Sequence, residues 1–213
     1  MSDVTFVIVP GWRNSGPGHW QSLWANQLPN AVRVEQDDWV SPLRSAWVAR
    51  LGETIHATDG PVILVAHSLG CIAATHLPDL FNHRIRGALL AAPADAERRP
   101  ALADFAPVAR RRLPYPSTVV ASSNDPYCPM NVSAAFAQAW GSELVQLEGA
   151  GHINVDSGHG PWPAGLALLA RLVDQTRPPP AQRSARPPVA TGSIYPYRIM
   201  TKKQIRLNQK TAL

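Results

Sequence analysis

Ser68 lies in residues 64–70, an apolar run that ends in a small-His-Ser-x-Gly turn before a helix-forming segment. In a nucleophile elbow, a strand delivers a serine to a sharp turn whose strained backbone exposes the hydroxyl above the sheet. Small residues are required on both sides because the backbones come close together there, and Ala66 and Gly70 meet that requirement. The same pattern also fits a buried strand that ends in Ser and Gly, so it needs support from the rest of the chain.

That support comes from two residues farther along the chain. A serine hydroxyl needs a histidine to accept its proton and a carboxylate to orient that histidine. In the α/β-hydrolase class the order is Ser, Asp or Glu, then His, each on a loop after a strand. Asp125 follows the predicted strand 117–122, and His152 follows the predicted strand 143–148 in a loop that contains glycines. We therefore predict that Ser68, Asp125 and His152 form a catalytic triad.

Other residues compete for these roles. Asp125 is also typical of an Asn-Asp-Pro turn that caps the helix after it. His159 is an alternative base and Asp156 an alternative orienting carboxylate, but both lie farther from the strand end and rank second. We expect His67 to be a packed histidine on the sheet side of the elbow. The other histidines without a partner signal, which we expect at surface or core positions, are His56, His76 and His83.

An oxyanion hole requires two backbone N–H groups near the serine. One is expected from Leu69, which directly follows the nucleophile. The other is expected from the loop 10–16 after the predicted strand 4–9, and Trp12 is the candidate donor there. Taken alone, the Pro-Gly pair in that loop indicates no more than an ordinary turn between a strand and a helix.

Five segments together resemble the small serine hydrolases of the retinoblastoma-binding-protein-nine and YdeN type. They occur in the order of that family, across about residues 4 to 175, and comprise 9–12, 18–21, 36–39, 65–71 and 149–154. The resemblance implies a compact α/β-hydrolase whose triad falls on Ser68, Asp125 and His152. It implies little about the substrate.

The name of the vertebrate member of that family suggests that it binds a partner through a Leu-x-Cys-x-Glu motif. In this chain Leu69 and Cys71 are followed by Ala73 where that motif requires Glu. The segment is also expected to be buried in the helix after the elbow. The binding role is therefore not transferred to this chain.

Strand and helix patterns alternate along the chain, which predicts a mostly parallel sheet of about six strands flanked by helices. The expected strands are 4–9, 31–35, 62–66, 85–91, 117–122 and 143–148, and the expected helices are 19–28, 43–56, 69–77, 131–140 and 163–175. Residues 93–116 stand where many hydrolases insert a lid. This insertion is short and has three prolines, Pro100, Pro107 and Pro114, between the two that bound it, so we expect a rim or small flap and no large cap domain.

The charge divides the 213 residues into two parts. Residues 1–176 carry 12 Lys and Arg against 15 Asp and Glu, whereas residues 177–213 carry 8 basic residues and no acidic one. We therefore predict a hydrolase domain over 1–176 and a basic, Pro-rich tail over 177–213, expected to be a solvated, disordered extension. Such a tail is able to attract an acidic partner. The domain has no basic stripe interleaved with aromatics, so no nucleic-acid partner is expected.

The chain contains only two cysteines, Cys71 and Cys128, and nothing favours a disulfide between them. Free thiols, together with an N-terminus that begins a strand within a few residues, favour a cytoplasmic location. No apolar run is long enough to predict membrane insertion. The sequence shows neither a Cys/His cluster with metal-ligand spacing nor a Gly-rich phosphate loop, so we expect no metal and no cofactor.

These patterns predict an enzyme, a carboxylesterase-like serine hydrolase. We expect it to cleave a small carboxylic ester, or with less support an amide or thioester, through an acyl-enzyme intermediate. The expected binding partner is thus a small acyl compound. The alternative is a hydrolase-fold binding protein with weak or vestigial catalysis, although no departure at the three triad positions supports it.

Overall fold

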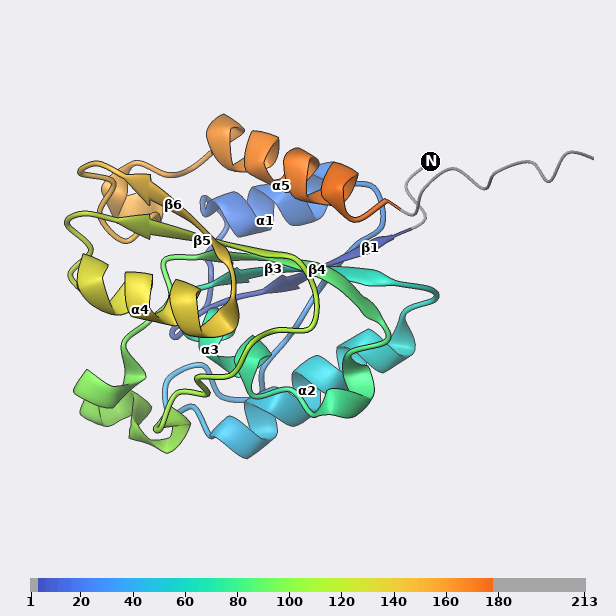
Figure 1. Ribbon diagram of the computed structural model, residues 1–213, viewed down its shortest axis with the longest axis horizontal. Helices are drawn as coiled ribbons and strands as arrows, with labels where there is room; N and C mark the ends of the chain where they lie inside the picture. Colours follow the sequence, from blue (N-terminus) through green and yellow to red (C-terminus); the bar gives the residue numbers. More distant parts are fainter. Residues whose placement is uncertain (1–3, 178–213) are drawn as a thin grey trace, which may run out of the picture. The chain divides into compact units, whose positions relative to one another are not determined.

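A computed structural model describes residues 4–177 of the chain. Its centre is a six-stranded sheet in the order β2-β1-β3-β4-β5-β6, and every neighbouring pair of strands is parallel (Figure 1). The strands are β1 (Thr5–Val9), β2 (Ala31–Arg33), β3 (Val62–His67), β4 (Ile85–Ala91), β5 (Ser117–Ser122) and β6 (Glu143–Leu147).

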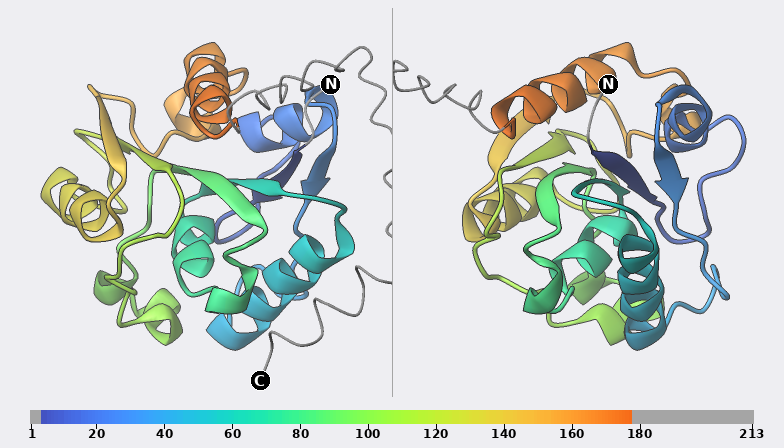
Figure 2. Two further views of the ribbon diagram at one scale, coloured as in Figure 1. Left: turned by 45° about the vertical axis from the view of Figure 1, so that its right-hand side comes forward. Right: turned by 90° about the vertical axis from the view of Figure 1, so that its right-hand side faces the viewer.

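Helices cover both faces of this sheet. Helices α1 and α5 lie on one face, and α2, α3 and α4 lie on the other (Figures 1 and 2). The helices are α1 (Trp20–Gln27), α2 (Arg44–Ala57), α3 (Leu69–Thr75), α4 (Met130–Trp140) and α5 (Pro163–Gln175). Four short 3-10 turns complete the described residues: η1 (Asp79–Phe81), η2 (Ala96–Arg98), η3 (Pro100–Phe105) and η4 (Val155–Ser157).

The central strands carry apolar side chains on both faces, because each face is covered by helices. In β3, Leu64 belongs to the core cluster under α2, α3 and α4, whereas its neighbour Val65 belongs to the cluster under α1 and α5. The second cluster contains three tryptophans in contact, Trp20, Trp24 and Trp162. Helices α1 and α5 are thus joined by large, buried aromatic rings.

The topology brings the candidate residues to one edge of the sheet. The carboxyl ends of parallel strands all lie at the same edge of the sheet. Ligands bind at that edge between two adjacent strands whose following connections run to opposite sides of the sheet. Strand β1 leads to β2 on one side and β3 leads to β4 on the other. The loops after β1, β3, β5 and β6 carry Trp12, Ser68, Asp125 and His152.

The observed elements agree with the predicted alternation. The fold is an α/β-hydrolase fold, and the sheet is parallel throughout. Residues 93–116 form the turns η2 and η3 in place of a large cap. Strand β2 ends at Arg33, two residues earlier than expected. The predicted basic tail lies, except for Arg177, outside the described residues. None of the helices in residues 4–177 combines the length and hydrophobicity needed to span a membrane.

Candidate active site

Ser68 occupies the turn between β3 and α3, and its backbone has φ 54° and ψ −121°. This left-handed region is unfavourable for a residue with a Cβ and costs roughly 1–3 kcal/mol. The surrounding structure holds the strained conformation, since the Ser68 N–H donates to the carbonyl oxygen of Ala91 at 3.0 Å. The strand, the turn and the helix thus present Ser68 as the sequence pattern predicts for a nucleophile elbow.

Gly70 is required because the elbow helix packs directly on the end of β1. A Cβ at Gly70 would lie 2.3 Å from the carbonyl oxygen of Val9 and 2.6 Å from that of Pro10. Both contacts are with backbone and cannot be relieved by a side-chain rotation. The close approach therefore involves β1, the neighbour of β3, while Ala66 is fully buried within β3 itself.

His152 lies on the loop after β6, between Ser68 and Asp125. Its Nε2 is 2.9 Å from Ser68 Oγ, and its Nδ1 is 2.8 and 2.9 Å from the two carboxylate oxygens of Asp125. All three side chains are buried. When Nδ1–H donates to the carboxylate, Nε2 is left to accept the serine proton. The structure thus brings the three predicted residues together in the arrangement that activates a serine.

The loop that carries His152 is fixed by side chains from other elements. The imidazole Nε2 of His67 lies 2.9 Å from the carbonyl oxygen of His152, and the indole N–H of Trp20 donates to the carbonyl oxygen of Ile153 at 2.9 Å. Burial lowers the pKa of His67 well below its ordinary value, with the nearby His152 and His19 acting in the same direction. His67 is therefore neutral and donates its Nε2–H to the carbonyl. The sharp bend of this loop uses a positive φ at Gly149, Gly151 and Ile153.

Tyr127 supports both partners of the serine. Its backbone N–H donates to Asp125 Oδ1 at 2.8 Å, and its ring centroid lies 4.3 Å from that of His152. The sequence shows it only as the last residue of the Asn-Asp-Pro-Tyr turn, a local pattern that carries no sign of the contact with a base 25 positions away.

The two candidate oxyanion donors come from different parts of the chain. Leu69 is the first residue of α3, and Trp12 is in the loop after β1. Within residues 4–177 neither N–H donates to a protein acceptor. A Cβ at Gly11 would lie 3.3 Å from Ser68 Oγ, so the Trp12 loop runs beside the nucleophile. The indole N–H of Trp12 donates to the carbonyl oxygen of Val40 at 2.8 Å, which fixes the ring.

The alternative residues lie in other environments. His159 Nδ1 is 3.2 Å from Ser157 Oγ, and its ring contacts Trp162. Asp156 is exposed on η4 at the border of the cavity above Ser68. His76 Nε2 lies 3.2 Å from the carbonyl oxygen of Phe105, and burial lowers its pKa. The exposed histidines are His56 and His83.

Residues 18–21, one of the five segments that carry the family resemblance, include side chains that link β1 with β3. His19 caps α1 by accepting the N–H of Gln21 on Nδ1, at 3.1 Å. Gln21 is fully buried, and its amide donates to the carbonyl oxygens of Val9 and Val65 at 3.0 and 2.9 Å. It therefore joins the ends of β1 and β3, the two strands beside the elbow. The pKa of His19 is lowered to about 4, chiefly by burial and then by Arg33.

Two cavities adjoin the triad. One of about 240 Å³ contains Ser68 and His152, and a second of about 400 Å³ shares Trp12 and Tyr127 with it. These volumes are suited to a small substrate.

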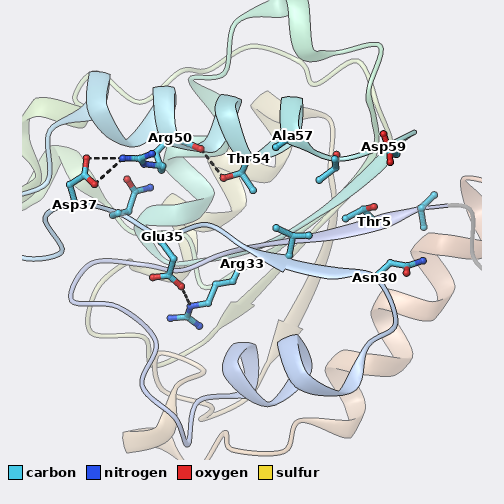
Figure 3. Close-up of a pocket in the computed structure, with 13 residues that line it drawn as sticks. Thr5, Asn30, Arg33, Glu35, Asp37, Arg50, Thr54, Ala57 and Asp59 are labelled. Carbon is cyan, nitrogen blue, oxygen red and sulfur yellow. Dashed lines mark hydrogen bonds and ion pairs between the residues drawn. The ribbon is translucent and has the colours of Figure 1, made fainter.

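A larger cavity, about 860 Å³, lies away from Ser68, along β2 and the side of α2 (Figure 3). Its arginines are already paired, Arg33 with Glu35 and Arg50 with Asp37 (Figure 3). Arg33 also donates to the carbonyl oxygen of Ser15, so it supports the loop after β1. The serine, base and carboxylate that the proposed chemistry needs line the smaller cavities or lie next to them.

Residues 4–177 contain no group of three or more His, Cys, Asp or Glu side chains placed to hold a metal ion. Cys71 and Cys128 are both buried and free. Burial raises the pKa of Cys128 to about 12, so its thiol is protonated near neutral pH.

Comparison with known proteins agrees with this geometry. A family model described as serine hydrolase matches residues 6–171. A solved structure described as a YdeN-like hydrolase of Pectobacterium atrosepticum has 36% identity and a TM-score of 0.76, covering 83% of this chain and 94% of that one. The ydeN gene product of B. subtilis has 22% identity and a TM-score of 0.66, covering 80% and 99% of the respective chains. No curated protein matches.

Proposed function

Because the chain belongs to the serine hydrolase family, we propose that it hydrolyses a small carboxylic ester through an acyl-enzyme intermediate on Ser68. The observation that carries the proposal is the continuous set of contacts from Ser68 Oγ through His152 to the Asp125 carboxylate. A buried base hydrogen-bonded to both a serine and a carboxylate is the arrangement by which a serine hydroxyl becomes a nucleophile.

In the acylation step, Ser68 Oγ attacks the acyl carbonyl carbon while His152 Nε2 accepts the hydroxyl proton. Negative charge develops on the carbonyl oxygen, and the N–H groups of Leu69 and Trp12 donate to it. Asp125 stabilises the imidazolium that has formed. His152 then gives its proton to the alcohol oxygen as the C–O bond to the leaving group breaks.

In the deacylation step, a water molecule replaces the alcohol. His152 accepts a proton from the water as its oxygen attacks the acyl carbon. When the tetrahedral intermediate collapses, the bond to Ser68 breaks and His152 returns the proton to Ser68 Oγ. An ester is favoured over an amide because an alcohol is the better leaving group. The small volume of the cavity around Ser68, about 240 Å³, favours a small acyl group.

Labelling with a fluorophosphonate tests the proposal, because this reagent phosphonylates an activated serine. We expect the wild-type protein to be labelled, and we expect Ser68→Ala to lose labelling and at least about 10³-fold of its ester hydrolysis. Ser45→Ala is a matched control, since Ser45 is exposed on α2. Unlabelled wild-type protein, or equal labelling of Ser68→Ala, would instead favour a hydrolase-fold binding protein.

A further inference from the structure

The second cavity extends the space above Ser68 toward two arginines. It contains about 400 Å³, and Trp12 and Tyr127 line both this cavity and the one that holds Ser68 and His152. Its outer wall comes from the turns η2 and η3, which are the rim formed by the short insertion. A substrate whose ester is at Ser68 can therefore place another group against this wall.

The guanidinium group of Arg99 lies over the ring of Tyr127 in this cavity. Its guanidinium carbon is 4.0 Å from the centroid of the Tyr127 ring, and its Nη2–H donates to the carbonyl oxygen of Pro126 at 2.9 Å. Within residues 4–177, Arg99 forms no ion pair with a carboxylate. Stacking and one hydrogen bond hold the cation in place, so its remaining N–H groups can bind an anion with little loss of side-chain entropy.

The other charges around the cavities leave this cation uncompensated. Arg98 is paired with the buried Asp95, with Nε and Oδ2 3.4 Å apart. Arg13 stacks on Trp12, 4.4 Å from its ring centroid, and has no carboxylate partner among the described residues. The catalytic cavity, which Arg13 also lines, has one exposed carboxylate among its lining residues, Asp156. The two aromatic residues shared by the cavities thus each carry an unpaired guanidinium.

From this arrangement we propose that the cavity beside Arg99 binds a carboxylate on the substrate, so that the enzyme prefers esters carrying a second, anionic end. The proposal rests on the proposed function and narrows its substrate class. A planar carboxylate matches the donor geometry of a guanidinium. The carboxylate belongs either to the acyl group or to the alcohol, and the two cases are separated by the choice of substrate.

Matched pairs of esters test the preference in the wild-type enzyme. The acyl side is tested with the 4-nitrophenyl monoester of adipic acid against the same ester in which the free carboxylate is replaced by a neutral amide. The alcohol side is tested with 4-acetoxybenzoate against 4-acetoxybenzamide. We expect kcat/KM to be about 10-fold higher for the carboxylate member of at least one pair. The preference should shrink as salt is raised, because the arginine is partly exposed. A ratio near one in both pairs would overturn the proposal.

Variants assign the preference to Arg99. Arg99→Gln should bring the ratio close to one, while Arg99→Lys, which keeps the charge but not the planar fork, should retain part of it. Arg171→Gln is the control, because it removes one positive charge that is paired with Glu143 at the far side of the fold. A preference that survives in Arg99→Gln would refute the assignment. If Arg99→Gln does not fold, the Arg99→Lys ratio and the salt dependence decide.

The failure of this proposal is distinguishable from the failure of the proposed function. If the protein is labelled by the fluorophosphonate and hydrolyses the neutral esters, but shows no preference for the carboxylate esters, only the anion subsite is refuted. If neither ester nor fluorophosphonate reacts, the proposed function fails, and calorimetric titration with adipate still tests the subsite. Binding by the wild type that Arg99→Gln loses would support it, and absence of binding would refute it.

Discussion

The Nε2 of His67 lies 2.9 Å from the carbonyl oxygen of His152, so the residue before Ser68 holds the backbone of His152. The two residues are 85 positions apart in the chain, since His67 is the last residue of β3 and His152 lies on the loop after β6. Together with the Trp20 N–H on the next carbonyl, this donor therefore fixes the position of His152 relative to Ser68. If His152 is the proposed base, we expect His67 to affect turnover by positioning it.

Replacing His67 should separate that positioning role from the packing role. His67→Phe keeps a buried ring but leaves the His152 carbonyl without its donor, which costs about 1–3 kcal/mol of stability. We expect kcat to fall about 10-fold with KM nearly unchanged. His67→Gln supplies an amide donor and should recover part of kcat. Equal kcat values for the Phe and Gln variants would show that His67 serves only to fill space.

Gly11 should tolerate no side chain, since a Cβ there would lie 2.7 Å from Ser68 Cβ. We expect Gly11→Ala to displace either the nucleophile or the loop that carries Trp12. A misplacement of about 1 Å reduces turnover by about 10²-fold. Gly16→Ala lies in the same loop, and its Cβ would have no atom within 4 Å, so it should stay close to the wild-type rate. Steady-state kinetics of the two variants and their thermal melts test this contrast.

The choice between the two candidate bases is also testable. His152→Ala should reduce acylation by at least about 10³-fold, because the proton of Ser68 then has no acceptor. His159→Ala should change the rate little, since its Nδ1 is within hydrogen-bond distance of Ser157 and not of Ser68. Burst kinetics with a chromogenic ester measure acylation directly. An inactive His159 variant beside an active His152 variant would reverse the assignment.

Local patterns were sufficient to predict most of the fold. The central strands are short β-branched or apolar runs and β6 alternates polar with apolar residues, and β4 and β5 begin and end at the predicted positions. Ser68, Asp125 and His152, which the structure brings within hydrogen-bond distance, were also selected from local context, because each follows a strand and the order of the three is itself a pattern. Their catalytic roles stay a prediction. The boundaries that differ, such as the end of β2, depend on pairing with β1.

The supporting contacts could not be predicted in this way. Trp20 and Ile153 are 133 positions apart, and Gln21 and Val65 are 44 apart, so no local pattern relates them. A buried glutamine within an amphipathic helix would be read from sequence as a polar surface residue. Its role becomes visible only in the structure, where its amide donates to backbone carbonyl oxygens of two neighbouring strands.

Stability should fall as the pH falls below neutral, because two histidines are buried in the neutral form. The pKa of His19 is lowered from 6.5 to about 4 by burial, with Arg33, His152 and His159 adding to the effect, and burial also lowers that of His67. A histidine in the unfolded chain takes up its proton near pH 6.5, before the folded protein does. The stability that these groups contribute is therefore fully present above about pH 6.5 and is lost as the pH falls toward the folded pKa values.

Thermal melts at pH 8 and pH 5 measure this effect, and we expect the Tm to drop by on the order of 5 °C or more. His19→Asn is the informative variant, because asparagine can still cap α1 but does not titrate. Its Tm should depend less on pH than that of the wild type, with His67 and His76, whose pKa values burial also lowers, left as further sources. A wild-type Tm that is equal or higher at pH 5, or a His19→Asn variant with an unchanged pH dependence, would contradict the expectation.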